Sequence, residues 1–428
     1  MSSPGIRYVN LARVLTAALP DAKVTVAVPD VYSQPGAEPF NVTYYKPEGV
    51  LSLVRRHDVV IAMSFPLPVL FACPFFRRPL LVLDFFSQFH IEWMEVGRDL
   101  YTGFHRRVWT RVGQIYANLQ LMVADYVLCA NERQRDSYLG VLASLGLLPP
   151  ATYDRDTTVR RLIDVAPHGI RSEPLPSVRR PVKGVYPGIE AGDKLILWLG
   201  GILYWYDPVT LLRALARVRQ KHPEVKLLFL GSVYPGGMDL GQGVRFREAV
   251  AETKRLGLWQ NGVYFHTEWL PYEEVVDYLL DADFSVTTYF TNAETRYAHR
   301  TRFLDFIWAR LPIVCTEGDV LADEVTARSW GITVRERDED GLVAALLRLV
   351  EDEEFAGACR ENLAAAAESL SWEAAFEPLV RFLSRRGGPE SIAEARHGRV
   401  LALLRSSIFY VAARLFERAV GWLSGRRA

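Results

Sequence analysis

Charged and hydroxyl side chains are concentrated in one loop of this 428-residue chain. The run before the loop, Phe284–Thr288, is β-branched and aromatic, which predicts a buried strand. The run after it, Leu304–Ala309, is apolar at helical spacing and ends at Leu311-Pro312. Ligands of open α/β sheets bind after strand ends, and a helix N-terminus beside arginines suits a phosphate group. The loop's candidates are Glu294, Arg296, His299, Arg300, Thr301 and Arg302. The alternative is a surface ion pair between Glu294 and Arg302.

Asp84 is a second candidate, at the end of the apolar run Leu80–Phe85. Because strand ends often carry active-site residues, Asp84 could contact a substrate, act as a base, or cap the next turn. His90 and Glu92 are close enough in sequence to join it, and otherwise they are solvated loop residues. The residues alone leave these interpretations open.

Three aromatic residues, Tyr204, Trp205 and Tyr206, precede an Asp-Pro pair. They could stack on a base or sugar, or be buried between domains. Asp207 before Pro208 predicts a helix N-cap with proline at the first helical position. His168, before Gly169, is interpreted as a turn residue.

Strands and helices alternate on both sides of a composition break at Glu173–Asp193, which holds four prolines and three glycines. The alternation predicts an α/β protein with two Rossmann-like βα domains that face a cleft, plus an extra C-terminal amphipathic helix. The expected parts are an N-terminal domain at 1–175, a linker at 176–193, a second domain at 194–370, a helix crossing back at 371–390, and the amphipathic helix at 391–428.

Composition narrows the class of protein. Lys and Arg together number 50, as do Asp and Glu, so net charge gives no indication of a nucleic-acid partner. The four cysteines lie far apart without metal-ligand spacing, which favours a reduced cytoplasmic setting and predicts no metal site. No signal peptide is recognised at the start. Val59–Phe76 is uncharged, but its prolines favour strand, loop and short helix over a membrane span.

Near the end of the chain, Arg399–Leu423 has an apolar helical stripe opposite a basic face. Such a helix could lie on an anionic membrane, pack on the body of the protein, or pair with another protomer. We expect the membrane role, and so a cytoplasmic protein that is peripheral on the inner membrane face.

Several segments, in order, resemble the GT-B-fold glycosyltransferases, specifically the family-4-like bacterial nucleotide-sugar enzymes. Val165–Ile170 (VAPHGI) resembles the family segment before the interdomain linker. Leu195–Gly201 (LILWLGG) resembles the first strand and glycine turn of the nucleotide domain. Asp281–Thr288 and Leu304–Val314 (LDFIWARLPIV) resemble two later motifs, the second written LEAMAxGxPVV. The match covers most of residues 5–380.

The resemblance implies transfer of a sugar from a nucleoside diphosphate sugar to a hydroxyl of a glycan or glycolipid in cell-surface polysaccharide synthesis. It implies a retaining mechanism with no metal or other cofactor. The family pattern is Glu-x7-Glu: Asp305 falls on the second carboxylate, which binds the ribose, and Glu294, with ten residues between, takes the place of the first, at the sugar. The implied catalytic set is Glu294, Asp84 and Arg302, and the donor-binding set is Gly200, Gly201, Trp205, Arg296, Arg300, Thr301 and Asp305.

Two departures from the family bear on the activity. No cation follows Gly200-Gly201, so we infer that Arg296, Arg300 and Arg302 supply the charge for the leaving diphosphate. Only about four residues precede the helix Gly5–Leu19, where the family has its first, central strand. We therefore expect a hole in that sheet unless another segment fills it. Both departures favour an alternative, a degenerate transferase that binds a nucleotide, glycan or partner without turnover; a sugar-nucleotide epimerase is a third hypothesis.

Overall fold

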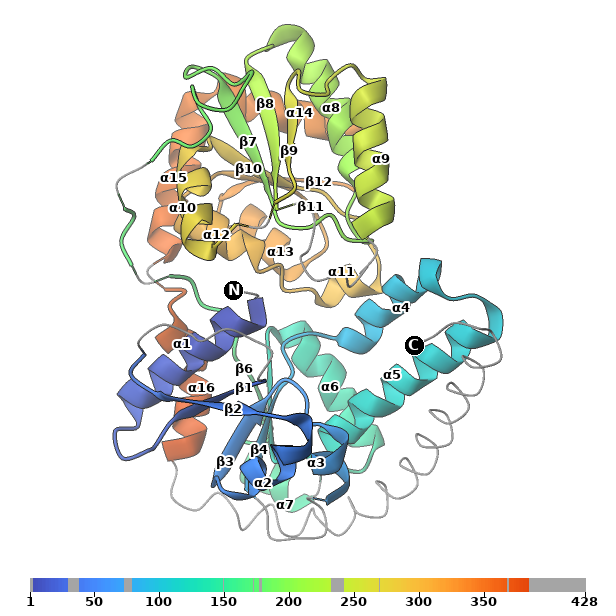
Figure 1. The fold of residues 1–428 in the computed structure, drawn as a ribbon, viewed down its shortest axis with the longest axis vertical. Helices are drawn as coiled ribbons and strands as arrows, with labels where there is room; N and C mark the ends of the chain where they lie inside the picture. The colour runs from blue at the N-terminus through green and yellow to red at the C-terminus, as the bar shows by residue number, and fades with distance from the viewer. Residues whose placement is uncertain are drawn as a thin grey trace. The chain divides into compact units, whose positions relative to one another are not determined.

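The computed structural model describes residues 3–29, 38–72, 79–148, 150–171, 173–176, 179–231, 242–268, 270–367 and 369–384. The chain forms two compact units (Figure 1). Of the described residues, unit 1 contains Gly169–Ser371, and unit 2 contains Ser3–His168 together with Trp372–Ser384. The chain thus leaves unit 2, completes unit 1 and returns. Both units are α/β with parallel sheets, as the sequence predicted.

Unit 1 is built on a six-stranded parallel sheet of order β12-β11-β10-β7-β8-β9. The strands are β7 Lys194–Leu199, β8 Val225–Leu230, β9 Val263–His266, β10 Phe284–Thr287, β11 Ile313–Thr316 and β12 Gly331–Val334. They are almost continuous apolar runs because helices cover both faces of a parallel sheet. The chain runs outward from β7 to β9 and then starts again at β10 on the other side of β7. The carboxyl ends of β7 and β10 therefore form the topological switch point, where crevices for ligands occur in such sheets.

Amphipathic helices close the core of unit 1. They are α8 Pro208–Lys221, α9 Gln242–Arg255, α10 Tyr272–Asp281, α11 Ala293–Tyr297, α12 Arg302–Trp308, α13 Val320–Ala327, α14 Glu339–Glu351 and α15 Glu353–Ala367. On α8, Leu211, Leu215 and Val218 recur at helical spacing and are fully buried. Helix α8 packs against α9 and α14, and α12 packs against α15.

The stretch predicted as a linker at 176–193 packs within unit 1. Val182 is fully buried, and the N–H groups of Val182 and Lys183 donate to Asp281 Oδ2 at 3.0 and 2.9 Å. Lys183 Nζ also lies 2.6 Å from Asp283 Oδ2. Its prolines and glycines therefore form turns against the domain surface, and the passage between the units falls at His168-Gly169.

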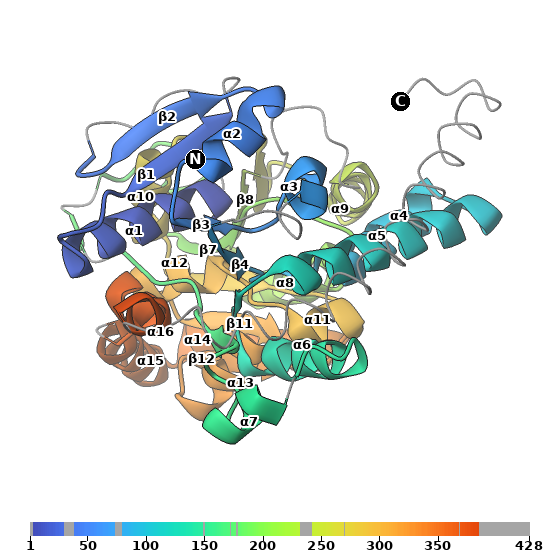
Figure 2. The same cartoon turned by 90° about the horizontal axis from the view of Figure 1, so that it is seen from below.

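Unit 2 contains two parallel sheets rather than one. Strand β1 (Thr25–Pro29) pairs with β2 (Asn41–Tyr45), and a separate sheet has the order β3-β4-β5-β6. The latter strands are β3 Val59–Ala62, β4 Leu80–Asp84, β5 Tyr126–Cys129 and β6 Ile163–Val165. The helices are α1 Ser3–Ala18, α2 Val50–Arg55, α3 Leu67–Ala72, α4 Phe89–Leu100, α5 Gly103–Val123, α6 Glu132–Ser144, α7 Pro150–Arg155 and α16 Trp372–Ser384, with a short 3-10 helix at Pro47–Gly49. Figure 2 shows β1 and β2 as a ribbon of their own.

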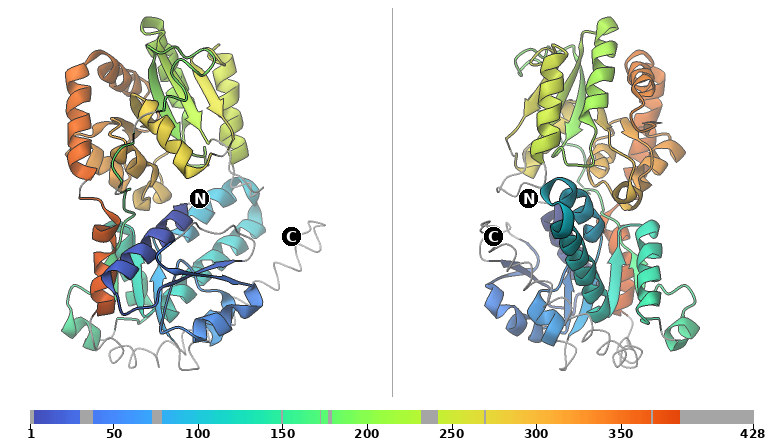
Figure 3. Two further views of the ribbon diagram at one scale, coloured as in Figure 1. Left: turned by 60° about the vertical axis from the view of Figure 1, so that its left-hand side comes forward. Right: turned by 90° about the vertical axis from the view of Figure 1, so that its right-hand side faces the viewer.

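Helix α16 lies where the sequence predicted the helix that crosses back at 371–390. Its residues Trp372, Phe376 and Leu379 are buried with Leu11 and Val14 of α1. Figure 3 shows this red helix beside the dark-blue α1. The last helix of the described chain therefore completes the core of the unit in which the chain starts.

Two predicted features lie outside the described residues: the amphipathic helix at 391–428, including Arg399–Leu423, and Cys73. Within the described part of the chain, no helix has the length and apolarity needed to span a membrane. His90 and Glu92 lie on helix α4 rather than in the solvated loop that the sequence allowed.

Candidate functional site

The two loops at the switch point of unit 1 are hydrogen-bonded to each other. Asp207 N–H donates to Thr288 O at 2.9 Å, and Phe290 N–H donates to Trp205 O at 2.8 Å. The Thr288 hydroxyl donates to Asp207 O at 2.5 Å. Because the first loop follows β7 and the second follows β10, this pairing fixes the polypeptide at the carboxyl ends of both strands.

Arg302, the first residue of α12, places its guanidinium against the glycine turn after β7. Its Nη2 donates to Gly201 O at 3.2 Å, and its guanidinium carbon lies 4.3 Å from the centre of the Tyr206 ring. Nη1 is buried and has no hydrogen-bond partner among the described residues. Gly200 has φ +82°, which favours glycine, and a Cβ there would lie 3.5 Å from Nη2.

Burial lowers the pKa of Arg302, an effect that the nearby Tyr206 opposes. Arginine is nevertheless charged at neutral pH, because its guanidinium is far more basic than other side chains. The switch point therefore holds the buried Arg302 guanidinium, whose Nη1 donates no hydrogen bond to the described residues. Its natural complement is an anion, and phosphate oxygens accept such charge-assisted hydrogen bonds.

Glu294 and Arg300 form a buried ion pair. Arg300 Nη1 and Nη2 donate to the two carboxylate oxygens of Glu294 at 3.1 and 2.8 Å. The two residues are only 5% and 6% exposed. The sequence had placed Glu294 at the sugar and Arg300 at the diphosphate, but in the structure each holds the other. Both roles remain predictions, and each requires atoms that the pair already uses.

Arg300 also links the loop to α13 and lies among aromatic rings. Its Nε is 3.7 Å from Asp319 Oδ2, and its guanidinium carbon is 4.8 Å from the centre of the Tyr289 ring and 5.3 Å from that of Tyr206. Burial alone would lower the pKa of Arg300, but the charge of Glu294 and the other acidic groups raises it. Burial raises the pKa of Asp319, and Arg300 opposes that rise. The cluster is a structural anchor that sequence reasoning did not find.

The other donor-side residues lie around this anchor. Arg296 is exposed on α11, and Asp305 is half-buried in the first turn of α12. Thr301 precedes α12 and makes no capping hydrogen bond with its side chain. Trp205 is half-buried, with its ring 5.7 Å from the Arg300 guanidinium carbon. The sequence-predicted set therefore comes together in one domain, on the loops that follow β7 and β10.

Asp207 is the predicted helix cap. Its carboxylate accepts from Thr210 N at 3.1 Å and from the Thr210 hydroxyl at 2.6 Å, and Pro208 follows at the first helical position. Tyr204 and Tyr206 are buried within unit 1, at 6% and 4% exposed. The structural interpretation of Asp207 is confirmed.

Asp84 in unit 2 is paired with Arg7, a residue that the sequence did not single out. Arg7 Nε and Nη2 donate to the two Asp84 oxygens at 2.7 and 2.6 Å, and both residues are fully buried. Arg7 also donates to Ala166 O and Pro167 O at 2.9 and 2.8 Å. The pair ties α1 to the carboxyl ends of β4 and β6. Contact between Asp84 and an acceptor would require this pair to open.

Three other sequence candidates in unit 2 are partly or fully buried. Burial lowers the pKa of His90 to about 4. Glu92 accepts a hydrogen bond from the Ser87 hydroxyl at 2.5 Å. His168 is 5% exposed and lies edge-on to Phe86, with ring centroids 4.9 Å apart. They contribute to packing near the carboxyl end of β4.

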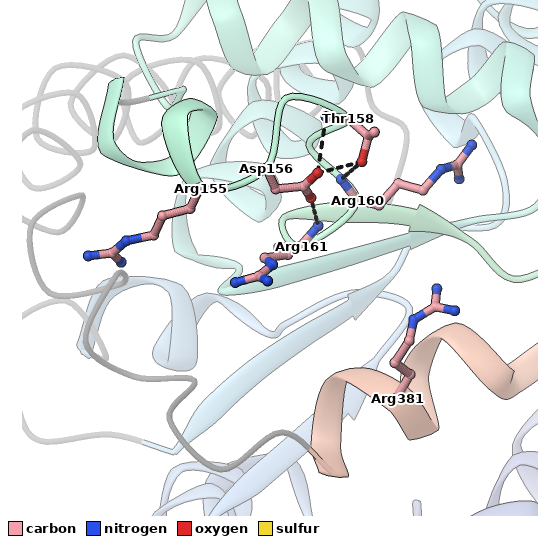
Figure 4. Close-up of a pocket in the computed structure, with 6 residues that line it drawn as sticks. All are labelled: Arg155, Asp156, Thr158, Arg160, Arg161 and Arg381. Atoms are coloured by element: carbon pink, nitrogen blue, oxygen red, sulfur yellow. Dashed lines mark hydrogen bonds between the residues drawn. The ribbon is translucent and has the colours of Figure 1, made fainter.

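An arginine-rich hollow of unit 2 lies elsewhere (Figure 4). It lies before the start of β6, whereas Asp84 lies at the carboxyl end of β4. The hollow is lined by Arg155, Asp156, Thr158, Arg160, Arg161 and Arg381. Asp156 accepts from the backbone N–H of Thr158 and of Arg161 at 3.0 and 2.8 Å. Arg160 and Arg381 both donate to Asp164. Because the protein's own carboxylates hold two of these arginines, we do not assign the hollow to the donor site.

In the described ranges, no group of three or more His, Cys, Asp or Glu could hold a metal ion.

Comparison with known proteins finds a related domain within unit 1. Residues 193–352 match the model of the family described as Glycosyl transferases group 1. That range contains the whole sheet of unit 1 and the Arg302 and Arg300 clusters. A search of curated protein sequences found no match.

Solved structures show that the chain has the GT-B fold. Anabaena Alr3699/HepE, solved in complex with UDP and glucose, is similar with a TM-score of 0.61 at 15% identity, over 90% of this chain and 98% of that one. WaaG, a glycosyltransferase involved in lipopolysaccharide biosynthesis, gives 0.58 at 14% identity over 88% and 95%. Sucrose-phosphate synthase from Thermosynechococcus elongatus gives 0.59 at 15% identity over 89% and 93%. At these identities the likeness establishes the fold.

Proposed function

We propose that this glycosyltransferase, which has the GT-B fold and a group 1 domain at residues 193–352, moves a sugar from a nucleoside diphosphate sugar to a hydroxyl acceptor. The observation that carries the proposal is the buried, uncommitted Nη1 of Arg302 at the switch point of unit 1. A diphosphate seated at the Gly200-Gly201 turn would complete the hydrogen bonding of that atom. HepE, which shares the fold, was solved with UDP and glucose bound.

The donor would be held by residues with separate tasks. Arg302 binds the diphosphate, and Gly200 and Gly201 let it approach the backbone because they have no side chains. Asp305, one turn into α12, accepts hydrogen bonds from the ribose hydroxyls. Glu294, which is paired with Arg300, orients the sugar. The exposed Arg296 adds positive charge.

In the reaction, the bond between the anomeric carbon and the diphosphate oxygen breaks and a bond to the acceptor oxygen forms. We propose a retaining, metal-independent transfer in which the departing phosphate takes the acceptor proton. Arg302 stabilises the charge that develops on that phosphate, and it does so best in a site from which water is excluded. The arrangement needs no separate carboxylate base, which agrees with the sealing of Asp84 by Arg7.

We place the acceptor among glycans or glycolipids of cell-surface polysaccharide synthesis, at the cytoplasmic face of the membrane. Two supports are the basic amphipathic pattern of Arg399–Leu423 and the fold shared with WaaG, which acts in lipopolysaccharide biosynthesis. A peripheral enzyme of this kind reaches a lipid-linked acceptor from the water side.

The test is calorimetric titration of the full chain with UDP, GDP, ADP and dTDP. For the nucleotide that binds, Arg302→Met should weaken affinity by about 10- to 150-fold, because a charged hydrogen bond contributes about 1.5–3 kcal/mol. Arg328→Ala removes an arginine whose side chain is 51% exposed, on the same unit, and should leave affinity unchanged. Equal affinity of Arg302→Met and the native chain would refute the assignment.

A second candidate is a degenerate transferase that binds donor without turnover. The absence of a cation after Gly201 favours it. The two functions separate in one assay, release of nucleoside diphosphate from the sugar donor that binds. Release that rises on addition of a glycan acceptor identifies the transferase, whereas tight binding without release identifies the binding protein. Release without acceptor would point to hydrolysis or to the epimerase hypothesis.

A further inference from the structure

The arginine-rich hollow of unit 2 encloses about 320 Å³. At roughly 30 Å³ for each water molecule, that space holds about ten waters, which is more room than a single small ion needs. Four of the six described residues that line it are arginines. They come from the end of α7, the turn before β6 and α16: Arg155, Arg160, Arg161 and Arg381. Guanidinium groups from distant parts of the chain, gathered around an open space, suit an anionic ligand.

The turn between α7 and β6, residues 156–161, is held in a defined conformation. The Asp156 carboxylate accepts hydrogen bonds from the Thr158 N–H at 3.0 Å, from the Thr158 hydroxyl at 2.5 Å and from the Arg161 N–H at 2.8 Å. Val159 has φ +59°, a left-handed conformation that β-branched residues rarely adopt. Its side chain is buried, and the bonds of Asp156 hold the turn on both sides of it. The arginines of the turn therefore extend from a fixed backbone.

Two of the four arginines are held by the protein's own carboxylates. Arg160 donates to Asp164 and to Glu132, the latter at 2.6 Å. Arg381 donates to Asp164 at 3.1 Å and to Glu377 at 2.7 Å. Because Asp164 belongs to β6, these contacts fasten α16 to that strand. A guanidinium has five N–H groups and the carboxylates use two on each arginine, so both arginines keep N–H groups for a ligand.

Arg155 and Arg161 differ, because their guanidinium groups form no hydrogen bond or ion pair with the described residues. Figure 4 shows their side chains extending to the same side of the turn, away from that of Arg160. Asp156 is the one carboxylate among the described lining residues, and its oxygens bond to the turn itself. Burial alone would raise the pKa of Asp156, but hydrogen bonds from Thr158 and Arg161 and the charge of Arg161 lower it, so the group is ionised at neutral pH. The charge that direct contacts with carboxylates leave uncompensated is therefore that of Arg155 and Arg161.

We propose that the hollow binds a phosphate monoester, with Arg155 and Arg161 donating to its terminal oxygens. A phosphate monoester carries about −1.5 to −2 charges at neutral pH and has three terminal oxygens, whereas a carboxylate carries one charge and has two oxygens. Two uncompensated arginines match the former. The spare N–H groups of Arg160 and Arg381 lie on the same lining, and the rest of the space admits the group esterified to the phosphate.

The phosphate belongs either to a free sugar phosphate or to the headgroup of a lipid of the phosphatidic acid class, and the test separates these sources. The hollow lies wholly in unit 2. The inference therefore goes beyond the proposed donor site of unit 1 and does not depend on it.

The test is calorimetric titration of the full chain carrying Arg302→Met, so that the proposed donor-site cation cannot contribute to binding. The two probes are glucose 6-phosphate and a short-chain, water-soluble phosphatidic acid. Arg155→Gln with Arg161→Gln in the same chain should weaken the affinity for the probe that binds about ten-fold or more, because each lost hydrogen bond involves charged partners. Binding of glucose 6-phosphate assigns a free ester, and binding of the lipid alone assigns a headgroup. No binding of either probe, or equal affinity of the double variant, would overturn the proposal.

A matched control removes the same charge elsewhere in unit 2. Arg55→Gln with Arg56→Gln changes two exposed positions at the end of α2 and should leave the affinity for the probe unchanged. Equal weakening by both double variants would show unspecific attraction to positive charge and overturn the site. With Arg302 intact, Arg155→Gln with Arg161→Gln should leave the affinity for nucleoside diphosphate unchanged, and a loss there would overturn a separate site.

Hydrogen exchange locates the ligand without any variant. In the native chain, the probe that binds should slow backbone exchange at residues 156–161, because the turn opens only after the ligand leaves. Strand β8 of unit 1, Val225–Leu230, is the internal reference and should exchange as before. Unaltered exchange at 156–161 in the presence of bound probe would contradict the assigned location.

Discussion

Glu294 and Arg300 each have two possible tasks that compete for the same atoms. Both carboxylate oxygens of Glu294 accept from Arg300, so a sugar hydroxyl that donates to Glu294 must share an oxygen with a guanidinium. Carboxylate oxygens have a second lone pair, which makes such sharing possible. Arg302 Nη1 has no hydrogen-bond partner in the described residues, and the Arg300 nitrogen in the same state, Nε, lies 3.7 Å from Asp319 Oδ2. We therefore propose Arg302, which contacts the Gly200-Gly201 turn, as the cation for the diphosphate, and Arg300 as the residue that holds the loop in place.

Breaking the buried ion pair of Glu294 and Arg300 should lower the free energy of unfolding much more than removing an exposed arginine does. Arg300→Met leaves the Glu294 charge uncompensated at 5% exposure, and we expect it to lower the free energy of unfolding by about 3–5 kcal/mol. Glu294→Gln should cause a smaller loss, because Asp319 still lies 3.7 Å from Arg300 Nε. The double variant should lose less than the sum of the two. Urea unfolding measures all three, and Arg328→Ala should change stability by less than about 0.5 kcal/mol. Additive losses would mean that the two charges do not interact.

Substitution of Asp84 distinguishes a structural role of this residue from a catalytic one. Asp84→Asn should lower the free energy of unfolding by about 3–5 kcal/mol, since it leaves Arg7 buried without its counter-charge. Arg7→Met in the same chain should recover part of that loss. Unfolding and transferase turnover are measured on the same samples. A variant with native stability and abolished turnover would support the catalytic role that the sequence suggested and contradict the structural one.

Among the elements, regular buried strands were predictable and irregular ones were not. Phe284–Thr288 was predicted as a buried strand and β10 spans Phe284–Thr287, because a strand buried on both faces of the sheet reads as a run of β-branched and aromatic residues. The short strand β2 and the helix α4 were missed. In α4, His90, Glu92 and Glu95 interrupt the apolar pattern, and its packing partner α5 decides its structure.

Within the candidate site, contacts between residues close in the sequence were predictable, and contacts between distant residues were not. The cap Asp207 was predicted because a cap bonds to residues only a few positions away. The pair of Arg7 with Asp84 spans 77 positions, and no spacing rule relates such residues. Asp319 also carries a local signal, as the cap of α13, but its approach to Arg300 depends on how two loops fold over the sheet.

Helix α4 should make the stability of the chain sensitive to mild acid. Burial holds the pKa of His90 at about 4 in the folded protein, against 6.5 when unfolded. The unfolded state therefore binds more protons between these values, so stability is full above pH 6.5 and is lost as the pH falls toward 4, by up to about 3 kcal/mol.

The measurement compares unfolding of the native chain and His90→Gln across pH 4 to 7. The variant should show a shallower loss in acid. His222 serves as a control with the opposite pH dependence of stability. Hydrogen bonds to Glu351 and Glu224 raise its pKa, so its contribution to stability is present in acid and lost as the pH rises. Parallel curves for the native chain and His90→Gln would exclude His90 as the source of the acid sensitivity.

At the scale of the whole molecule, the order of the chain makes the two units unequal. Unit 1 is one continuous stretch, Gly169–Ser371, whereas unit 2 needs α16 from the far side of unit 1. Trp372, Phe376 and Leu379 of α16 are each 6% exposed or less. Burial of such side chains stabilises by about 1.5–3 kcal/mol each, so together they supply a large part of the roughly 5–15 kcal/mol that holds a domain folded.

We therefore expect opposite outcomes from two truncations. A fragment of residues 169–371 should unfold cooperatively by itself and bind the preferred nucleoside diphosphate about as tightly as the full chain, because the Arg302 and Arg300 clusters lie within it. A chain ending at Ser371 should keep that binding but lose the thermal transition of unit 2, since Leu11 and Val14 of α1 lose the apolar cover of α16. Calorimetric unfolding with and without nucleotide separates the two transitions, because ligand raises only the one that it binds. Loss of nucleotide binding by the 169–371 fragment would show that donor binding also requires unit 2.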